Sequence, residues 1–297
     1  MMRIAAIGEC MIELREQADG TFARSFGGDT LNTAVYLARL GVDVDYVTAL
    51  GDDAWSDEMI SAWQSEGIGT SQAIRKTGRL PGLYVIQTDK HGERRFSYWR
   101  GQSPARDIFN GDEQRDFSNY DFIYLSGITL SLYSEQGRMN LFAILKNAAA
   151  NGAKIIFDTN YRPRNWATVH ESQTAFAKIY ALTNLLFASS QDLDLLYGQS
   201  DRSTLRNLLP DAEIIYKRAD PACWVMTASD EILVHAKPIA NVVDTTAAGD
   251  SFAAAYIAAR INGASAEDSA IAGHRLAGQV VQFPGAIIPR DKMPRAE

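Results

Sequence analysis

Short runs of β-branched and aromatic residues alternate with helical patterns along most of this chain of 297 residues. The alternation predicts parallel strands joined by crossover helices, because a tight turn cannot connect parallel neighbours. We expect strands at 3–8, 44–49, 122–126, 154–158, 185–188, 213–217 and 223–227. We expect helices at 30–40, 53–66, 136–151, 171–182, 191–197, 203–209, 248–262 and 266–281. The pattern therefore predicts an α/β fold with a doubly wound, mostly parallel sheet.

Residues 82–102 depart from that pattern. They form two extended runs separated by the letters DKHG, which is typical of a β-hairpin. With a side-chain period of two, Phe96, Tyr98 and Arg100 share one face of the second run, and Tyr84 lies on the first run. Together with residues 10–27, we expect this hairpin to form a small antiparallel sheet, a lid over one domain that spans 1–297.

Composition excludes several classes of protein. The net charge of −7 and a pI near 5.2 argue against a nucleic-acid partner. Cys10 and Cys223 form no CxxC pair and the four histidines are scattered, so neither a zinc site nor a disulfide framework is indicated. Acidic residues interrupt the apolar run near the start of the chain. We therefore expect a cytoplasmic protein without a membrane partner.

Residues 242–252 read VVDTTAAGDSF and suggest a phosphate site. Thr245 and Thr246 could cap a helix that begins near Ala247, and the small side chains there would let a phosphate approach the free amides of its first turn. Asp250 would lie beside the same space and could accept a proton from a hydroxyl group. Taken alone, the pattern favours the simpler interpretation of a tightly packed helix start.

Residues 27–41, GGDTLNTAVYLARLG, suggest a polar site at the start of an early helix. The glycine pair permits a tight strand-to-helix turn, Asp29 or Thr30 could cap the helix, and Asn32 falls on its first turn. Carboxylate and amide oxygens suit the hydroxyl groups of a sugar. The alternative is that Asp29 is only a cap and that Asn32 is only solvated.

Two further stretches carry candidate ligand-binding side chains. On the hairpin, Tyr84, Tyr98 and Arg100 could close over a ligand, with the arginine as a fork for a carboxylate; alternatively, this aromatic face is buried against a partner subunit. In DTNYRPRNW, which follows a strand end, Arg162 could clamp the substrate or the moving phosphate. For Arg164 and Trp166 in the same stretch, a surface stacking pair is the favoured interpretation.

The sequence DTTAAGDSF resembles the D-T-x-G-A-G-D-x-F signature of the ribokinase/PfkB family of sugar kinases. GGDTLNTA resembles the first glycine-pair motif of that family, and KRADPACWV resembles its K-x-G-x-x-G-x-x-V segment. Within the family, GECMIEL, FSYWR, FDTNYRPRNW and VVQFPGAIIP are most similar to the kinases of 2-dehydro-3-deoxygluconate (KDG). The resemblance implies a ribokinase-like Rossmann-type sandwich with a β-sheet lid, and transfer of the γ-phosphate of ATP, with Mg²⁺, to the 6-hydroxyl of KDG.

The resemblance also implies roles for individual residues. Asp250 would be the general base, and the backbone amides of Ala247, Ala248, Gly249 and Asp250 would form an anion hole. The sugar acid would be bound by Gly28, Asp29, Asn32, Tyr84, Tyr98, Arg100, Arg162 and Asp250. ATP would be bound by Asn160, Ser189, Lys217, Ala219, Ala222, Gly249 and His274. The metal ligands are left unassigned.

The chain departs from the family pattern at three places. Ala247 replaces the first glycine of the signature, and Ala219 and Ala222 replace glycines of the nucleotide segment. Alanine fits at little cost where φ is negative and is strained where φ is positive. The letters SSQD at 189–192 stand where the family commonly has N-x-x-E. We nevertheless expect the anion hole to be intact.

Two other functions stay open at this stage. One is a kinase for a neutral sugar such as fructose or ribose on the same fold; the arginines argue against it, because a neutral sugar would give buried guanidinium groups no charge partner. The other is a sugar- or nucleotide-binding protein without catalysis, although the presence of Asp250 beside the small-residue run argues against it. We expect a homodimer or higher homo-oligomer formed through the aromatic lid sheet.

Overall fold

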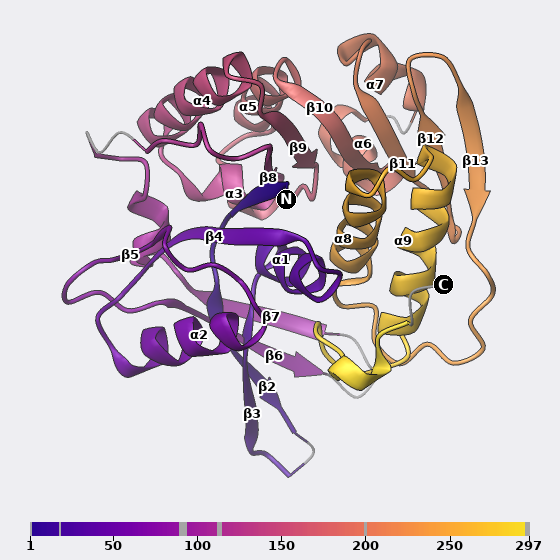
Figure 1. The fold of residues 1–297 in the computed structure, drawn as a ribbon. Coiled ribbons are helices and arrows are strands. Elements are labelled where there is room, and N and C mark those ends of the chain that lie inside the picture. The colour runs from indigo at the N-terminus through magenta and orange to yellow at the C-terminus, as the bar shows by residue number, and fades with distance from the viewer. Residues whose placement is uncertain (1, 18, 89–93, 112–114, 199–200, 295–297) are drawn as a thin grey trace.

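The computed structural model describes residues 2–17, 19–88, 94–111, 115–198 and 201–294 (Figure 1). Its main sheet has the strand order β13-β12-β11-β10-β9-β8-β1-β4-β5. Each neighbouring pair from β5 to β11 in this order is parallel, whereas β12 pairs antiparallel with both β11 and β13. The bounds are β1 Arg3–Ile7, β4 Asp43–Leu50, β5 Ala73–Arg75, β8 Phe122–Ser126, β9 Lys154–Asp158, β10 Thr183–Ser189, β11 Glu213–Lys217, β12 Ala222–Met226 and β13 Glu231–His235. The mostly parallel sheet predicted from the sequence is confirmed.

Helices cover both faces of this sheet. The α-helices are α1 Asp29–Arg39, α2 Ala54–Ser65, α3 Gly127–Leu132, α4 Glu135–Ala150, α5 Val169–Tyr180, α6 Ser190–Tyr197, α7 Arg202–Leu208, α8 Ala248–Ile261 and α9 Ala266–Val280. Buried side chains of α1, α2, α8 and α9 form one hydrophobic core, and those of α4 to α7 form the other. Along β9, Ile155 and Phe157 enter one core while Ile156 enters the other. A strand buried on both faces has to be apolar at successive positions, and this is what made the strands visible in the sequence.

A second sheet of four strands, in the order β3-β2-β6-β7, projects from one side of the main domain (Figure 1). Its strands are β2 Met11–Glu16, β3 Phe22–Gly27, β6 Gly82–Thr88 and β7 Arg94–Trp99. The hairpin strands β6 and β7 pair as expected, and the DKHG turn lies outside the described residues. The expectation of an antiparallel sheet is wrong at one place, since β2 and β6 are parallel. Both strands leave the main domain in the same direction, so they pair in parallel and not antiparallel.

Among the α-helices and strands of the described residues, three were not predicted. β5 covers only Ala73–Arg75, β13 is an edge strand with partly exposed side chains, and α3 follows β8 without an intervening loop. Such elements are too short, or too exposed on one side, to give a clear hydrophobic period. Among the described residues, no helix is long and apolar enough to cross a membrane.

Candidate functional site

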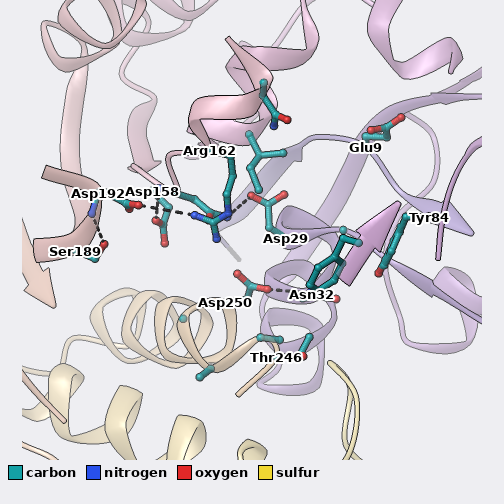
Figure 2. Close-up of a pocket in the computed structure, with 18 of the residues that line it drawn as sticks. Glu9, Asp29, Asn32, Tyr84, Asp158, Arg162, Ser189, Asp192, Thr246 and Asp250 are labelled. Carbon is teal, nitrogen blue, oxygen red and sulfur yellow. Dashed lines mark hydrogen bonds and ion pairs between the residues drawn. The ribbon is translucent and has the colours of Figure 1, made fainter. Parts of the chain in front are cut away.

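A cavity of about 610 Å³ lies where the carboxyl ends of the parallel strands face the lid sheet. Open parallel sheets place their ligands at this edge. The cavity is lined by most of the predicted site residues: Gly28, Asp29, Asn32, Tyr84, Tyr98, Arg100, Asn160, Arg162, Ser189, Lys217, Ala247, Ala248, Gly249 and Asp250. Segments more than 200 residues apart in the sequence therefore meet in one space (Figure 2).

Three predicted nucleotide residues do not line this cavity. Ala219 lies in an exposed loop, and Ala222 is buried at the start of β12. His274 contacts the Cys223 thiol at 3.4 Å and the carbonyl of Val234 at 3.2 Å. Burial lowers the pKa of this imidazole, as expected for a packed histidine. His274 therefore packs against β12 and β13 and does not line the cavity.

The N-terminus of α8 is open to the cavity. Its N-cap residue is Ala247, and no side chain caps the helix. The prediction that Thr245 or Thr246 caps it is therefore wrong; the Thr246 amide instead donates to Asp244 at 2.8 Å. The Ala248 amide donates to the Thr245 carbonyl at 3.2 Å. Other amides of an uncapped first turn remain available to a ligand, and the helix dipole favours an anion there.

Ala247 has φ 59° and ψ 15°, the left-handed conformation that glycine adopts freely. Asn160 is the other non-glycine residue with positive φ in the described chain, at 26°, and it too lines the cavity. The backbone at Ala247 thus has the shape that the family signature would give with glycine, held at some cost in strain.

A second open helix terminus, that of α1, faces the same cavity. Its N-cap is Gly28 and it has no side-chain cap, so the expectation that Asp29 or Thr30 caps α1 is also wrong. A Cβ at Gly28 would overlap the carbonyl oxygen of Glu9, and this close approach requires glycine. Each of the other described α-helices has a Ser, Thr or Asp cap. Both uncapped helix starts line the cavity, as does the capped start of α6.

Asp250 lies between these helix starts. Its Oδ2 accepts a hydrogen bond of 2.8 Å from the Asn32 amide (Figure 2). Burial and the nearby carboxylate of Asp29 raise the pKa of Asp250 to about 8, against the opposing effect of Asn32. Asp29 is itself held by the Asn160 side chain at 2.7 Å, and burial raises its pKa too. A carboxylate with a raised pKa is a stronger base for proton abstraction.

Charged groups from three adjacent strand ends line the other side of the cavity. The Lys217 ammonium contacts Asp158 Oδ2 at 3.2 Å. Asp192 accepts a hydrogen bond from the Thr159 hydroxyl at 2.6 Å and lies 3.8 Å from Arg162 Nη1. Ser189 accepts from the Asp192 backbone amide at 3.1 Å, so its hydroxyl caps α6.

The fit of this site to Mg²⁺ follows from these donors. In the described ranges, no group of three or more His, Cys, Asp or Glu side chains is arranged to hold a metal by itself. Asp158 and Asp192 are nevertheless oxygen donors beside the open α8 terminus. Mg²⁺ is commonly held by one or two carboxylates together with substrate phosphates and water. The site therefore fits a magnesium ion carried by a nucleotide.

The lid presents stacked aromatic rings to the cavity. Tyr84 and Tyr98 stack with ring centroids 5.7 Å apart, and Phe96 lies 6.3 Å from Tyr98. The Tyr84 hydroxyl donates to the buried carboxylate of Glu13. Tyr84 consequently offers a ring face to a ligand, with its hydroxyl already engaged.

Glu9 was not among the site residues predicted from the sequence. This carboxylate is 3% exposed, lines the cavity and forms an ion pair with Arg100, which crosses from the lid to the main domain. An acid in the loop directly after a buried central strand was the signal that could have identified it. Arg100 is therefore already paired with a carboxylate of the protein.

The predicted stacking of Arg164 with Trp166 is wrong. Arg164 lies 4.5 Å from the ring centroid of Tyr98 and donates to its hydroxyl at 2.8 Å, so it connects the main domain to the lid. Trp166 is buried against Phe176. Arg164 and Trp166, two residues apart, contact different partners, and tertiary contacts decided the partner of each.

Known proteins resemble this chain in sequence and in fold. Residues 1–293 match the family described as pfkB family carbohydrate kinase. The chain is 44% identical to 2-dehydro-3-deoxygluconokinase of Escherichia coli strain K12, covering 98% of this chain and 99% of that protein. It is also 44% identical to the enzyme of that name from Dickeya dadantii, covering 98% of each. The structure of a fructokinase with bound ATP from Xylella fastidiosa superimposes with a TM-score of 0.84 at 23% identity, covering 98% of this chain and 95% of that one.

Proposed function

The chain belongs to the pfkB family of carbohydrate kinases, and we propose that this sugar kinase transfers the γ-phosphate of ATP to the 6-hydroxyl of 2-dehydro-3-deoxy-D-gluconate. The full-length relatives that are 44% identical carry that activity in their names and support this substrate. The observation that carries the chemistry is Asp250, a buried carboxyl group with a raised pKa at the uncapped start of α8. A base and an anion site in contact are what phosphoryl transfer to a hydroxyl requires.

In the proposed reaction, Asp250 accepts the proton of the 6-hydroxyl while the new O–P bond forms. The bond between the γ-phosphorus and the β-γ bridging oxygen breaks, and ADP leaves. The amides of Ala247 to Asp250 stabilise negative charge on the phosphoryl group in transit. Asn32 holds Asp250 in place, and the lid rings exclude water that would otherwise accept the phosphate. A bound Mg²⁺ would neutralise phosphate charge, with Asp158 and Asp192 as the nearby oxygen donors.

The carboxylate of the sugar acid is the feature that separates it from a neutral sugar. Arg162 is the better placed clamp, because its side chain is 46% exposed and its nearest carboxylate, Asp192, is 3.8 Å away. Arg100 is already neutralised by Glu9, so its charge does not by itself require an acidic substrate. This pairing favours a neutral sugar such as fructose as the second candidate.

A phosphotransfer assay that follows ADP release distinguishes these substrates. Wild-type protein is offered KDG, gluconate, fructose and ribose, with Asp250→Asn as the test of the base and the exposed Asp211→Asn as a matched control. We expect the highest kcat/KM with KDG, loss of activity in Asp250→Asn and normal activity in Asp211→Asn. Turnover of fructose without turnover of KDG would refute the substrate, and a fully active Asp250→Asn would refute the base.

We further propose a homodimer formed through the outer face of the lid. Trp99 of β7 and Leu80, just before β6, are 63% and 62% exposed, and with Leu83 of β6 and Trp55 of α2 they line an apolar groove. Exposed apolar area of this kind commonly marks an interface. Light scattering after size exclusion should give a dimer for wild type and a monomer for Trp99→Asp; Met139→Asp, at an exposed site on α4, should remain a dimer. A dimeric Trp99→Asp would contradict the proposed interface.

Because ATP is the donor, we place the enzyme in the cytoplasm.

A further inference from the structure

We infer that Glu9 is a further substrate-binding residue: its carboxylate accepts a hydrogen bond from a secondary hydroxyl group of the sugar, and its ion pair with Arg100 connects the bound sugar to the lid. The inference deepens the proposed kinase function and rests on it. Glu9 lies in the loop after β1, a central strand of the main sheet, and Arg100 directly follows β7, an edge strand of the lid. Their ion pair therefore joins the two sheets at the wall of the cavity.

The unsatisfied polar atoms of this pair are the first argument. Apart from the ion pair itself, both carboxylate oxygens of Glu9 and the Nε and Nη2 atoms of Arg100 are buried without a hydrogen-bond partner among the described residues. Buried polar atoms of folded proteins almost always have such a partner. Because Glu9 is 3% exposed and lines the cavity, a polar ligand in that space is the partner within its reach.

The place of Glu9 in the cavity is the second argument. In Figure 2, the Glu9 and Tyr84 side chains lie on one side of Asp250, and Ser189 and Asp192 lie on the other. Asp192 is one of the oxygen donors proposed for the magnesium ion that the nucleotide carries. Glu9 therefore lies at the end of the cavity away from the nucleotide, where the proposed reaction places the sugar.

The chemistry of the sugar selects the group that Glu9 would bind. As half of an ion pair, the Glu9 carboxylate accepts hydrogen bonds and donates none, so its partner has to be a donor such as a hydroxyl group. The carboxylate and the ketone of KDG are acceptors, and its hydroxyl groups are on C4, C5 and C6. The proposed reaction directs the 6-hydroxyl to Asp250. The 4- and 5-hydroxyls therefore remain as donors to Glu9.

Two glycines leave room for Glu9 in this position. A Cβ at Gly82, the first residue of β6, would lie 2.9 Å from Glu9 Oε1 and 3.1 Å from Arg100 Cβ. The carbonyl oxygen of Glu9 occupies the space that a Cβ at Gly28 would fill. Glu9 is therefore enclosed between the lid and the start of α1, and an acceptor that is already held in place costs little entropy when it binds a ligand.

The alternative is an ion pair that only fastens the lid. The two roles differ in their dependence on the hydroxyl groups of the sugar. Loss of a purely structural pair weakens the reaction of every sugar alike, whereas loss of a direct acceptor matters only when the sugar carries the hydroxyl that it binds. A cycle that combines a protein variant with a deoxy analogue of the sugar therefore separates the two roles.

The experiment measures kcat/KM of wild type and Glu9→Ala with KDG and with its 4-deoxy and 5-deoxy analogues. We expect wild type to prefer KDG over at least one analogue by about 10- to 100-fold, the usual effect of losing a hydrogen bond to a charged group. Glu9→Ala should prefer KDG over that same analogue by less than about threefold. Glu16→Gln, which changes an exposed carboxylate of β2, is the matched control and should show the preference of wild type.

A second variant guards against misfolding, because Glu9→Ala leaves Arg100 without its partner. Glu9→Gln keeps the shape of the side chain and a neutral acceptor, so the preference of this variant for KDG should lie between those of wild type and Glu9→Ala. The inference is overturned if Glu9→Ala, or Glu9→Gln where Glu9→Ala does not fold, keeps the full preference of wild type for KDG over both analogues. If wild type phosphorylates fructose and not KDG, the proposed function fails, and the same cycle with deoxyfructoses decides the role of Glu9.

Discussion

Replacing Ala247 by glycine should stabilise the protein. Ala247 has φ 59°, and a residue with a Cβ pays about 1–2 kcal/mol for this left-handed conformation. Glycine relieves that strain. It also makes the unfolded chain more flexible, and this lowers the free energy of unfolding by about 0.5–1 kcal/mol. The expected net increase in the free energy of unfolding is therefore about 0.5–1 kcal/mol. For a chain of 297 residues this corresponds to a rise in Tm of roughly 1–2 °C.

Chemical denaturation and differential scanning calorimetry measure this change, with Ala248→Gly as the matched control. Ala248 is the first residue of α8 and has a negative φ, so glycine there should lower stability by up to about 1 kcal/mol. The anion hole uses backbone amides, and kcat/KM of Ala247→Gly should stay within about threefold of wild type. The reasoning is refuted if Ala247→Gly loses as much stability as Ala248→Gly, or if its activity falls by more than about tenfold.

The pH dependence of activity and three other substitutions test the cavity. The kcat/KM of wild type should rise as pH increases towards about 8, where the free enzyme loses the Asp250 proton; a flat profile from pH 6 to 9 would contradict this. Because the folded-state pKa of Asp250 lies above the unfolded value of 3.8, the folded state loses stability as pH rises between these values. Asp250→Asn should therefore melt at a higher temperature than wild type, with a gap that widens from pH 4 to pH 8. Gly28→Ala would push a methyl group into the Glu9 carbonyl and should cost about 1–3 kcal/mol of stability, measured by urea titration; an unchanged midpoint would show that α1 can shift freely. Tyr84→Phe removes the donor to buried Glu13 and should cost about 1–3 kcal/mol, with a raised KM for the sugar; unchanged stability and KM would show that this hydrogen bond holds nothing in place.

The sequence predicted the sheet well for a physical reason. Strands such as β8 and β9 are buried on both faces, so they read as short, mostly apolar runs in the sequence. The same logic failed for β5 and β13, where short length and exposure weaken the hydrophobic signal. The parallel pairing of β2 with β6 was also missed, because strand direction depends on where each strand leaves the main domain.

The cavity shows a similar division. Asp250, Asn32 and Arg100 could be named from their motifs, since the order of small residues and acids along the chain restricts the local chemistry. Their partners could not be named. Glu9 meets Arg100 only because the lid folds over the end of β1, and Lys217 meets Asp158 only because β9 and β11 flank the same strand.

Local sequence thus determined the strands, the helices and the small-residue turn before Asp250, because these depend on hydrophobic period and backbone freedom over a few residues. The tertiary structure alone decided the conformation of Ala247, the absence of caps on α1 and α8 and the raised pKa of Asp250. Those properties arise from burial and from charges that approach across more than 200 residues of chain, and no local pattern specifies them.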